Sequence, residues 1–151
     1  DLDLDAISRA LLGGGGGGGA LGSDRGPRQF SIVQSEAGAY ISRLAEVAPR
    51  SVQCVMLDAY DARGRVPSHL QAPPFLRALA RVLAPGGAAV ANLFHGSAAA
   101  RGACAAFAAA LASALGGRVH ALRVCGHEDN LVIIAIKPAA PTAAAPTAAA
   151  A

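Results

Sequence analysis

Two carboxylates stand directly after an apolar run of the chain, and they are the residues best suited to chemistry. The run at 52–57 stops at Asp58, and Asp61 follows three residues later. A carboxylate beside an amine nucleophile can accept its proton, and the negative charge attracts the ammonium form. The pair therefore predicts a proton-accepting or amine-binding site at the start of a turn rich in Gly, Arg and Pro.

The elements that must position these acids alternate between strands and helices. After a short amphipathic helix at 4–12, strands and helices alternate up to residue 115, and two further strands then form an antiparallel hairpin. This order implies an open, mostly parallel α/β sheet with helices on both faces and one antiparallel strand from the hairpin. The predicted strands are 30–34, 52–57, 88–94, 118–125 and 130–137, and the predicted helices are 36–47, 73–83 and 97–115.

Two of these elements carry clear burial patterns. The apolar run at 52–57 is typical of a central parallel strand that is covered on both faces. The helix at 73–83 begins with two prolines, which suit a first helical turn, and its apolar residues recur at helical spacing. We expect its core face to carry Phe75, Leu76, Leu79, Val82 and Leu83.

Polar residues gather where the predicted parallel strands end. In an open α/β sheet, ligands bind beyond the carboxyl ends of the strands, and these ends carry Asp1, Glu36, Asp58 and the segment 92–95. Clustered acids are costly unless donors or cations meet them, so we expect a ligand that offers hydroxyls, an amine or a positive charge. The alternative is that Asp1 and Glu36 only cap the helices that follow them.

Four segments carry a resemblance to a known family. "DLDLDAISRA", "VQSEAGAYI", "LDAYD" and "LAPGG" resemble, in that order, motifs of the spermidine synthase-like branch of the class I S-adenosylmethionine-dependent methyltransferase superfamily. The resemblance covers residues 1–137. It implies a Rossmann-like sheet from which the first strand and its Gly-rich loop are missing, so the sequence resembles an N-terminally truncated domain.

The resemblance also implies roles for the acids. Asp1 would bind the ribose hydroxyls, and Glu36 with the amide of Ala37 would hold the adenine, of S-adenosylmethionine or its decarboxylated form. Asp58 would lie beside the cofactor and accept the proton of the attacking amine, and Asp61 would help to hold the amine. Two features depart from the family: Glu36 stands in place of an Asp, and "ARGRVPSHLQAP" replaces the segment that follows the acid pair in aminopropyltransferases.

Three functions follow as hypotheses. The first is an S-adenosylmethionine-dependent methyltransferase whose acceptor is an amine of a small molecule or a protein. The second is an aminopropyltransferase of polyamine biosynthesis, which the spacing of Asp58 and Asp61 favours. The third is a truncated, non-catalytic module that binds a partner or forms a homodimer, which the missing first strand favours.

Composition narrows the partners. The net charge is only +3 and aromatic residues make up 4% without any Trp, so the basic stripe and stacking rings of a nucleic-acid interface are absent. No run reaches the ~20 apolar residues of a membrane span, and the four histidines lack metal-ligand spacing. Three widely spaced cysteines predict reduced, buried thiols in an intracellular compartment, either cytoplasmic or organellar.

We expect one domain at 1–137 and a disordered tail rich in Ala, Pro and Thr at 138–151. Residues 13–28 form a Gly-rich, low-complexity segment inside the domain. Its glycine run lies after a predicted helix and lacks the spacing of a phosphate-binding loop, so we expect a flexible insertion rather than a ligand site.

Overall fold

The computed structural model describes residues 32–140, and the chain divides into two units at Ser35 and Glu36. All described helices and strands belong to the second unit. Asp1, the predicted helix at 4–12, the Gly-rich segment and residues 141–151 of the tail lie outside the described residues. The elements are α2 (Ala37–Val47), β1 (Val52–Leu57), the 3-10 helix η1 (Ser68–Leu70), α3 (Pro73–Val82), β2 (Leu83–Phe94), α4 (Ala98–Leu115), β3 (Arg118–Val124) and β4 (His127–Ile136).

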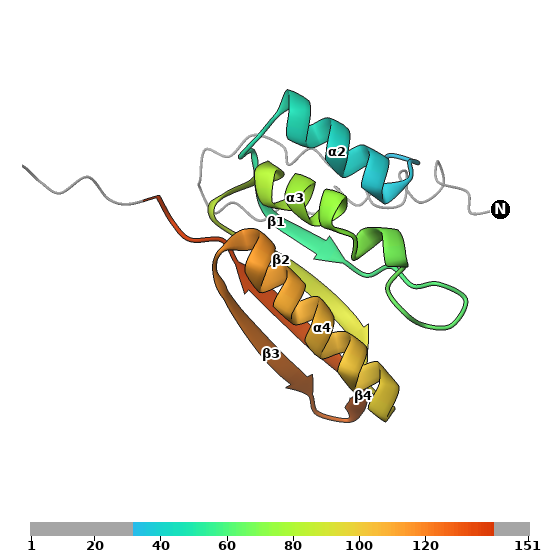
Figure 1. Cartoon of the computed structure of the whole chain (residues 1–151). Helices are drawn as coiled ribbons and strands as arrows, with labels where there is room; N and C mark the ends of the chain where they lie inside the picture. Colours follow the sequence, from blue (N-terminus) through green and yellow to red (C-terminus); the bar gives the residue numbers. More distant parts are fainter. Residues whose placement is uncertain (1–31, 141–151) are drawn as a thin grey trace, which may run out of the picture. The chain divides into compact units, whose positions relative to one another are not determined.

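The four strands form one sheet in the order β1-β2-β4-β3 (Figure 1). β1 and β2 are parallel, whereas β4 runs antiparallel to both of its neighbours. The prediction of one antiparallel strand from the C-terminal hairpin is therefore confirmed. The hairpin turn is tighter than expected, because β4 already begins at His127 and Gly126 adopts a left-handed φ of 78°.

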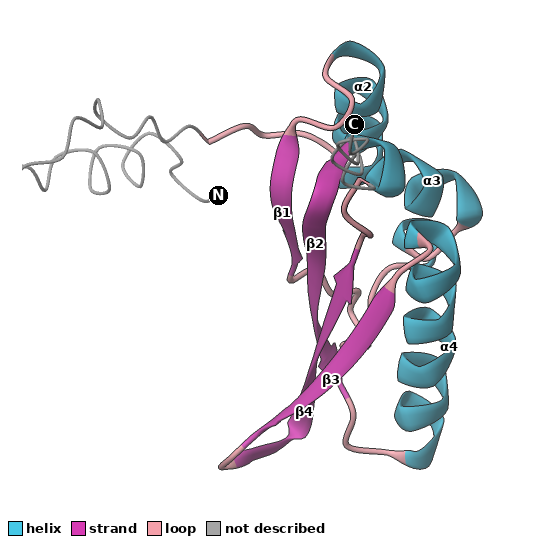
Figure 2. Ribbon diagram, turned by 90° about the vertical axis from the view of Figure 1, so that its left-hand side faces the viewer, coloured by secondary structure: helices cyan, strands magenta, loops and turns pink. Residues whose placement is uncertain are grey.

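All three described α-helices cover the same face of the sheet (Figure 2). The predicted arrangement, with helices on both faces, is not found among these helices. For α3 and α4 the reason lies in the connections: from β1 to β2 to β3 the chain moves in one direction across the sheet. Right-handed crossovers that step in one direction place their helices on one face, and a reversal is needed to reach the other.

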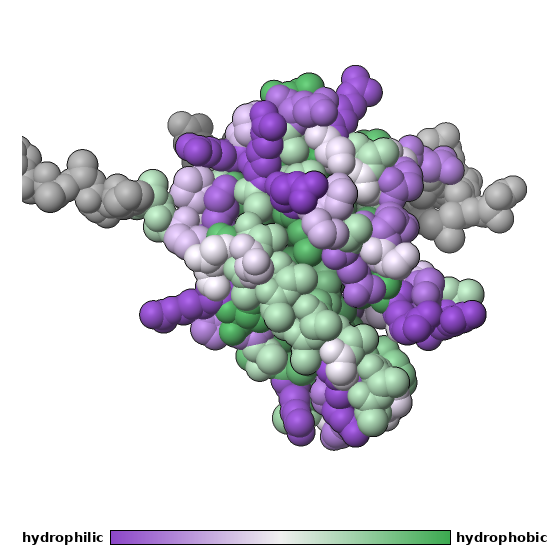
Figure 3. Space-filling view, in the orientation of Figure 1, coloured by the Kyte–Doolittle hydropathy of each residue, from purple (hydrophilic) through white to green (hydrophobic). Residues whose placement is uncertain are grey.

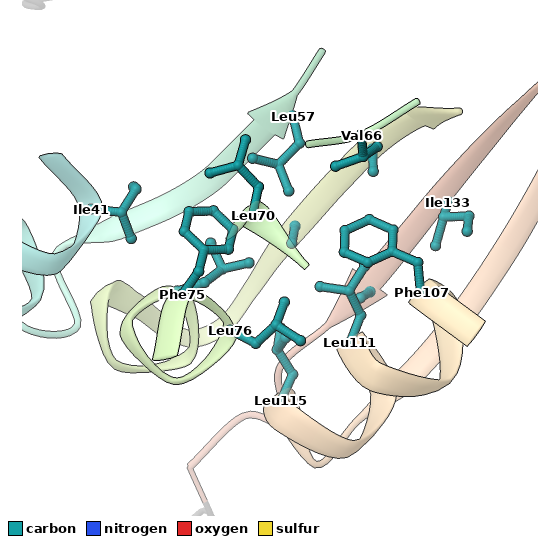
Figure 4. Close-up of a cluster of buried hydrophobic side chains, with 14 of the residues drawn as sticks. Ile41, Leu57, Val66, Leu70, Phe75, Leu76, Phe107, Leu111, Leu115 and Ile133 are labelled. Carbon is teal, nitrogen blue, oxygen red and sulfur yellow. The ribbon is translucent and has the colours of Figure 1, made fainter. Parts of the chain in front are cut away.

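The core lies between the three helices and the covered face of the sheet (Figure 4). The burial predicted for the helix at 73–83 is confirmed, since all five of the named residues are at most 4% exposed, but Leu83 is the first residue of β2 and not part of α3. α4 contributes Phe107, Leu111 and Leu115, and β4 contributes Ile133. This packing fixes the register of helix against strand, because burial of an apolar side chain contributes about 1.5–3 kcal/mol.

β1 has the predicted bounds but not the predicted burial. Only Leu57 is buried in it, and Met56 is 77% exposed. Among the described strands β1 lies at the edge of the sheet, and its side chains alternate between the helix-covered face and the other face. Met56 lies opposite Val90, which lies opposite Ile134, so a row of apolar residues crosses the uncovered face.

The cysteines are free, as expected, but the prediction of buried thiols is correct only for Cys104. Cys54 and Cys125 are exposed, because Cys54 lies on the uncovered face of β1 and Cys125 lies in the hairpin turn. A further difference concerns the predicted strand at 30–34: its described part, 32–34, is not assigned to a strand.

The "LAPGG" segment belongs to β2, which begins at Leu83 rather than at residue 88. Leu83 pairs with Val52, and the register then shifts before Cys54 pairs with Ala88. Gly87 lies inside this irregularity, where a Cβ would come within 2.9 Å of the Gln53 and Ala84 carbonyl oxygens. The chain therefore needs a glycine at this close approach of two strands.

Ser97 is the N-cap of α4, and its hydroxyl accepts from the Ala100 amide; Gly116, in a left-handed conformation, is the C-cap of the helix. Its alanines form a pale apolar strip on the surface (Figure 3). By length and composition it could cross a membrane, with a mean hydropathy of 1.5. That is weak evidence, because an apolar core helix passes the same test, and α4 packs against α3 and β4.

Candidate functional site

The carboxyl ends of β1 and β2 lie side by side, and Asp58 and Asn92 meet there. Leu57 pairs with Ala91 in parallel register, which brings the next residue of each strand to the same edge. The Asn92 side-chain amide donates to Asp58 Oδ1 at 3.2 Å. The sequence analysis placed Asn92 at the end of a predicted strand but did not assign it to the site. That position was the available signal, because polar residues at the ends of neighbouring parallel strands lie at the same edge of the sheet.

Tyr60 completes this cluster. Its hydroxyl donates to the Asn92 carbonyl oxygen at 2.9 Å, which ties the loop after β1 to the end of β2. Burial raises the pKa of Tyr60, and the nearby Asp58 carboxylate raises it further. The three residues thus form a connected group. The Asn92 side-chain amide orients Asp58 Oδ1, and the Tyr60 hydroxyl holds the backbone carbonyl of Asn92. We name Asp58, Tyr60 and Asn92 the strand-end cluster.

Asp61 has a different setting, because it organises its own loop. Its Oδ1 accepts the backbone amides of Arg63 at 2.8 Å and Arg65 at 3.0 Å, and its Oδ2 lies 3.7 Å from the Arg65 guanidinium. These amides, Arg65 first, lower the pKa of Asp61. Gly64 closes the turn with a φ of 69°. The carboxylate is therefore a loop-forming group as well as a candidate for holding an amine.

A cavity of about 340 Å³ opens between this loop, the end of β2 and the first turns of α4. Its polar residues come from the loop, from η1 and from Gln71 directly after η1, and its apolar residues come from β2, from α4 and, as Val66, from the loop. Asp61 lines the cavity, whereas Asp58 does not. The lining residues are Asp61, Gly64, Arg65, Val66, Ser68, Gln71, Leu93, Phe94, Ala100, Ala103, Cys104 and Phe107.

Two polar groups of the cavity are already engaged by backbone oxygens. Gln71 Nε2 donates to the Val66 carbonyl at 2.6 Å, and the Cys104 thiol donates to the Phe94 carbonyl at 3.3 Å. Burial raises the pKa of the Cys104 thiol. Because the thiolate is the nucleophilic form, this cysteine is suited to lining the cavity and not to attacking a ligand.

Glu36 is the N-cap of α2, as the alternative interpretation of the sequence allowed. Its two carboxylate oxygens accept the amides of Gly38 at 2.8 Å and Ala39 at 2.7 Å. One of them also lies 3.0 Å from His69 Nε2 of η1. The backbone hydrogen bonds, Gly38 first, lower the pKa of Glu36. Ala37, the other residue expected to hold adenine, is the exposed first residue of α2.

The structure thus brings some of the predicted residues together and separates others. Asp58 lies in the strand-end cluster, Asp61 in the cavity wall, and Glu36 with Ala37 at the start of α2. Asp1 lies outside the described residues. Within residues 32–140, no group of three or more His, Cys, Asp or Glu side chains is arranged to hold a metal ion.

Two of the solved structures that this chain resembles are the following. One is described as a probable spermidine synthase from Corynebacterium glutamicum ATCC 13032: it is 22% identical, the match covers 63% of this chain and 35% of that chain, and the TM-score is 0.47. The other is a possible exported protein from Bordetella parapertussis, with 13% identity, 61% and 41% coverage and a TM-score of 0.44. The chain therefore spans about two-fifths or less of each neighbour. No protein-family model and no curated protein matches the sequence.

Proposed function

We propose that this chain contributes the acceptor side of an S-adenosylmethionine-dependent methyltransferase of the spermidine synthase-like group. The observation that carries the proposal is the strand-end cluster: Asp58 directly follows β1, and Asn92, which lies in β2 two residues before its end, donates to Asp58. Ligands of open α/β sheets bind at this edge. The choice of the spermidine synthase-like group is based on the resemblance of "LDAYD", "LAPGG" and the motifs before them, in this order, to motifs of that group.

In the proposed reaction Asp58 receives a proton from the acceptor amine. Asn92 donates to Oδ1, which leaves Oδ2 to face the amine and accept its proton as the nitrogen takes up the transferred group. The nitrogen–carbon bond forms as the carbon–sulfur bond of the donor breaks, and the sulfur keeps that electron pair. Tyr60 acts as a positioning residue, because its hydroxyl fixes the Asn92 carbonyl.

The described residues fit the cofactor only in part. S-adenosylmethionine, when bound, supplies a methyl group on a positively charged sulfur, and the Asp58 carboxylate suits a neighbour of that charge. In the observed arrangement both Glu36 oxygens accept amides of α2. A carboxylate oxygen can accept more than one hydrogen bond, so the capping of α2 and the proposed contact with adenine are compatible.

The aminopropyltransferase hypothesis remains a second candidate, since Asp61 follows Asp58 at the spacing of polyamine synthases and lines a cavity. The use of Asp61 by its own loop favours methyl transfer over this alternative, because a diamine substrate needs a second carboxylate. The non-catalytic module is a third candidate, and the exposed Met56 with the apolar row across the sheet favours it.

One experiment separates the three. The protein is incubated with S-adenosylmethionine or its decarboxylated form, each with n-hexylamine or putrescine, and the products are identified by mass spectrometry. We expect methylated amine from the ordinary cofactor and no spermidine from the decarboxylated one. Spermidine would establish the aminopropyl alternative. The absence of any product in all four mixtures would reject both enzymatic hypotheses for this chain.

A further inference from the structure

We infer that the cavity beside the first turns of α4 binds an uncharged small molecule, an apolar ring that carries one hydroxyl group. Its volume of about 340 Å³ lies near the lower end of small-molecule sites, which begin at about 300 Å³, so a single substituted ring is the size of ligand that it suits. The inference concerns binding and does not rest on the transfer reaction proposed above, because Asp58 does not line this cavity.

The charged side chains of the cavity compensate one another. Of the described residues that line it, Asp61 and Arg65 are the charged ones. Asp61 Oδ1 accepts two backbone amides of its loop, and Oδ2 lies 3.7 Å from the Arg65 guanidinium. A cation placed on Oδ2 would meet the guanidinium, and an anion placed on the guanidinium would meet the carboxylate. An ion moved from water into this cavity therefore finds no uncompensated partner, which makes its burial costly, and an uncharged ligand avoids this cost.

The remaining polar groups of the cavity suit a hydroxyl group. Gln71 donates through Nε2 to the Val66 carbonyl oxygen at 2.6 Å, which leaves its Oε1 as an acceptor. The Ser68 hydroxyl has no hydrogen-bond partner within residues 32–140, so it can donate to a ligand or accept from it. A ligand hydroxyl donates one hydrogen bond and accepts others, and it can therefore pair with Gln71 Oε1, with Ser68, or with both.

The apolar part of the lining supports a ring. It comes from Leu93 and Phe94 of β2 and from Ala103 and Phe107 of α4. Leu93 and Phe107 are each 3% exposed, so the core holds them in place and this part of the cavity is formed before a ligand enters. The two phenylalanine rings offer edges and faces on which an aromatic ligand packs. The Cys104 thiol donates to the Phe94 carbonyl oxygen at 3.3 Å and therefore adds no second polar site.

The test compares four probes that share one p-tolyl ring: p-cresol, toluene, p-methylbenzylamine and p-methylbenzoate. The whole chain is titrated with each probe at neutral pH without a cofactor, and the amide resonances of α4 and of the loop between β1 and η1 are followed by NMR. We expect p-cresol to bind at least about threefold more tightly than toluene, because it gains a hydrogen bond. We also expect it to bind at least about fivefold more tightly than the ammonium and carboxylate probes.

Two variants locate the site. Ala103→Leu places a larger side chain at the cavity and should weaken p-cresol binding at least about tenfold. Ala106→Leu is the matched control, because Ala106 is exposed on the same helix and does not line the cavity; its affinity for p-cresol should equal that of the wild type.

A second pair of variants tests the charge compensation. Arg65→Gln removes the cation beside Asp61 and should raise the affinity for p-methylbenzylamine about two- to fivefold, the range of a partly exposed ion pair. Arg77→Gln loses the same charge from an exposed position of α3 that does not line the cavity, and it should leave that affinity unchanged. Equal binding of p-cresol and toluene, wild-type binding of either ion as tight as that of p-cresol, or equal effects within either pair of variants would each overturn the inference.

Discussion

The hydrogen bond from Tyr60 gives the sharpest test of the strand-end cluster. Tyr60→Phe removes the hydroxyl that donates to the Asn92 carbonyl at 2.9 Å and leaves the ring in place. An intramolecular hydrogen bond contributes about 0.5–1.5 kcal/mol, and the 41% exposure of Tyr60 places this one in the lower half, about 0.5–1 kcal/mol. For a domain of this size, the melting temperature should fall by about 2–6 °C.

The same residue reports on Asp58 through its ionisation. The chain has two tyrosines and no tryptophan, so in a Tyr40→Phe background the near-ultraviolet phenolate signal belongs to Tyr60 alone. We expect its pKa to lie above that of free tyrosine, because burial raises it first and the Asp58 charge second. Asp58→Asn should then lower the pKa of Tyr60, since it removes the charge and retains most of the shape of the side chain.

The control for that titration is Glu46→Gln, which removes a carboxylate from the exposed surface of α2. It should leave the pKa of Tyr60 unchanged. The sign of the linkage also sets the stability profile: a raised pKa means that the neutral phenol is favoured by folding, so its contribution is complete below the ordinary tyrosine pKa and is lost as the pH rises through the folded value. A Tyr60 pKa that does not respond to Asp58→Asn would refute the geometry of the cluster.

Three further predictions concern the scaffold and the loop. Leu111→Ala removes a fully buried side chain of the core and should cost about 2–5 kcal/mol in urea unfolding; a loss below about 1 kcal/mol would contradict its place there. Gly117→Ala should prevent stable folding, because a Cβ would collide with the Ile136 carbonyl, whereas Gly102→Ala meets no atom and should stabilise α4 by up to about 1 kcal/mol in the same assay. Asp61 has a lowered pKa, so the order of its loop should be complete above the ordinary aspartate pKa and be lost as the pH falls through the folded value; loop amide resonances that stay unchanged in NMR spectra across that range would contradict it.

Local patterns were enough to predict the elements that are regular over several residues. The bounds of β1 were predicted without error, because an apolar run lies between the Pro49 segment and Asp58. The core face of α3 followed from helical spacing, since its large apolar residues, Phe75, Leu76, Leu79 and Val82, are all buried. The C-terminal hairpin followed in the same way from two apolar runs separated by a short polar segment.

Burial of a strand depends on partners that are distant in sequence, and these are not written in the strand itself. The run in β1 looks like a central strand, yet Met56 lies on a face that no described helix covers. The side of the sheet on which α2, α3 and α4 pack depends on the direction in which successive strands are added, which local spacing does not contain. The exposure of Cys54 has the same cause.

The sequence was enough to predict the edge of the sheet at which the candidate site lies, but not the contacts between its residues. The sequence placed Asp58 and Asn92 at neighbouring strand ends, and the parallel register brings them into contact. It could not decide whether Glu36 caps a helix or holds a ligand, because the same position serves both uses. The cavity was not foreseen, since its residues come from the loop after β1, η1, β2 and α4.

The central claim is that Asp58 accepts the proton of the acceptor amine at the β1–β2 edge. Its most direct test is the rate of methyl transfer from labelled S-adenosylmethionine to n-hexylamine for the wild type, Asp58→Asn and Glu46→Gln. A positioned proton acceptor contributes about 10²–10⁴-fold, so Asp58→Asn should lower the rate by at least about a hundredfold while Glu46→Gln retains it. Transfer by Asp58→Asn at the wild-type rate would contradict the claim.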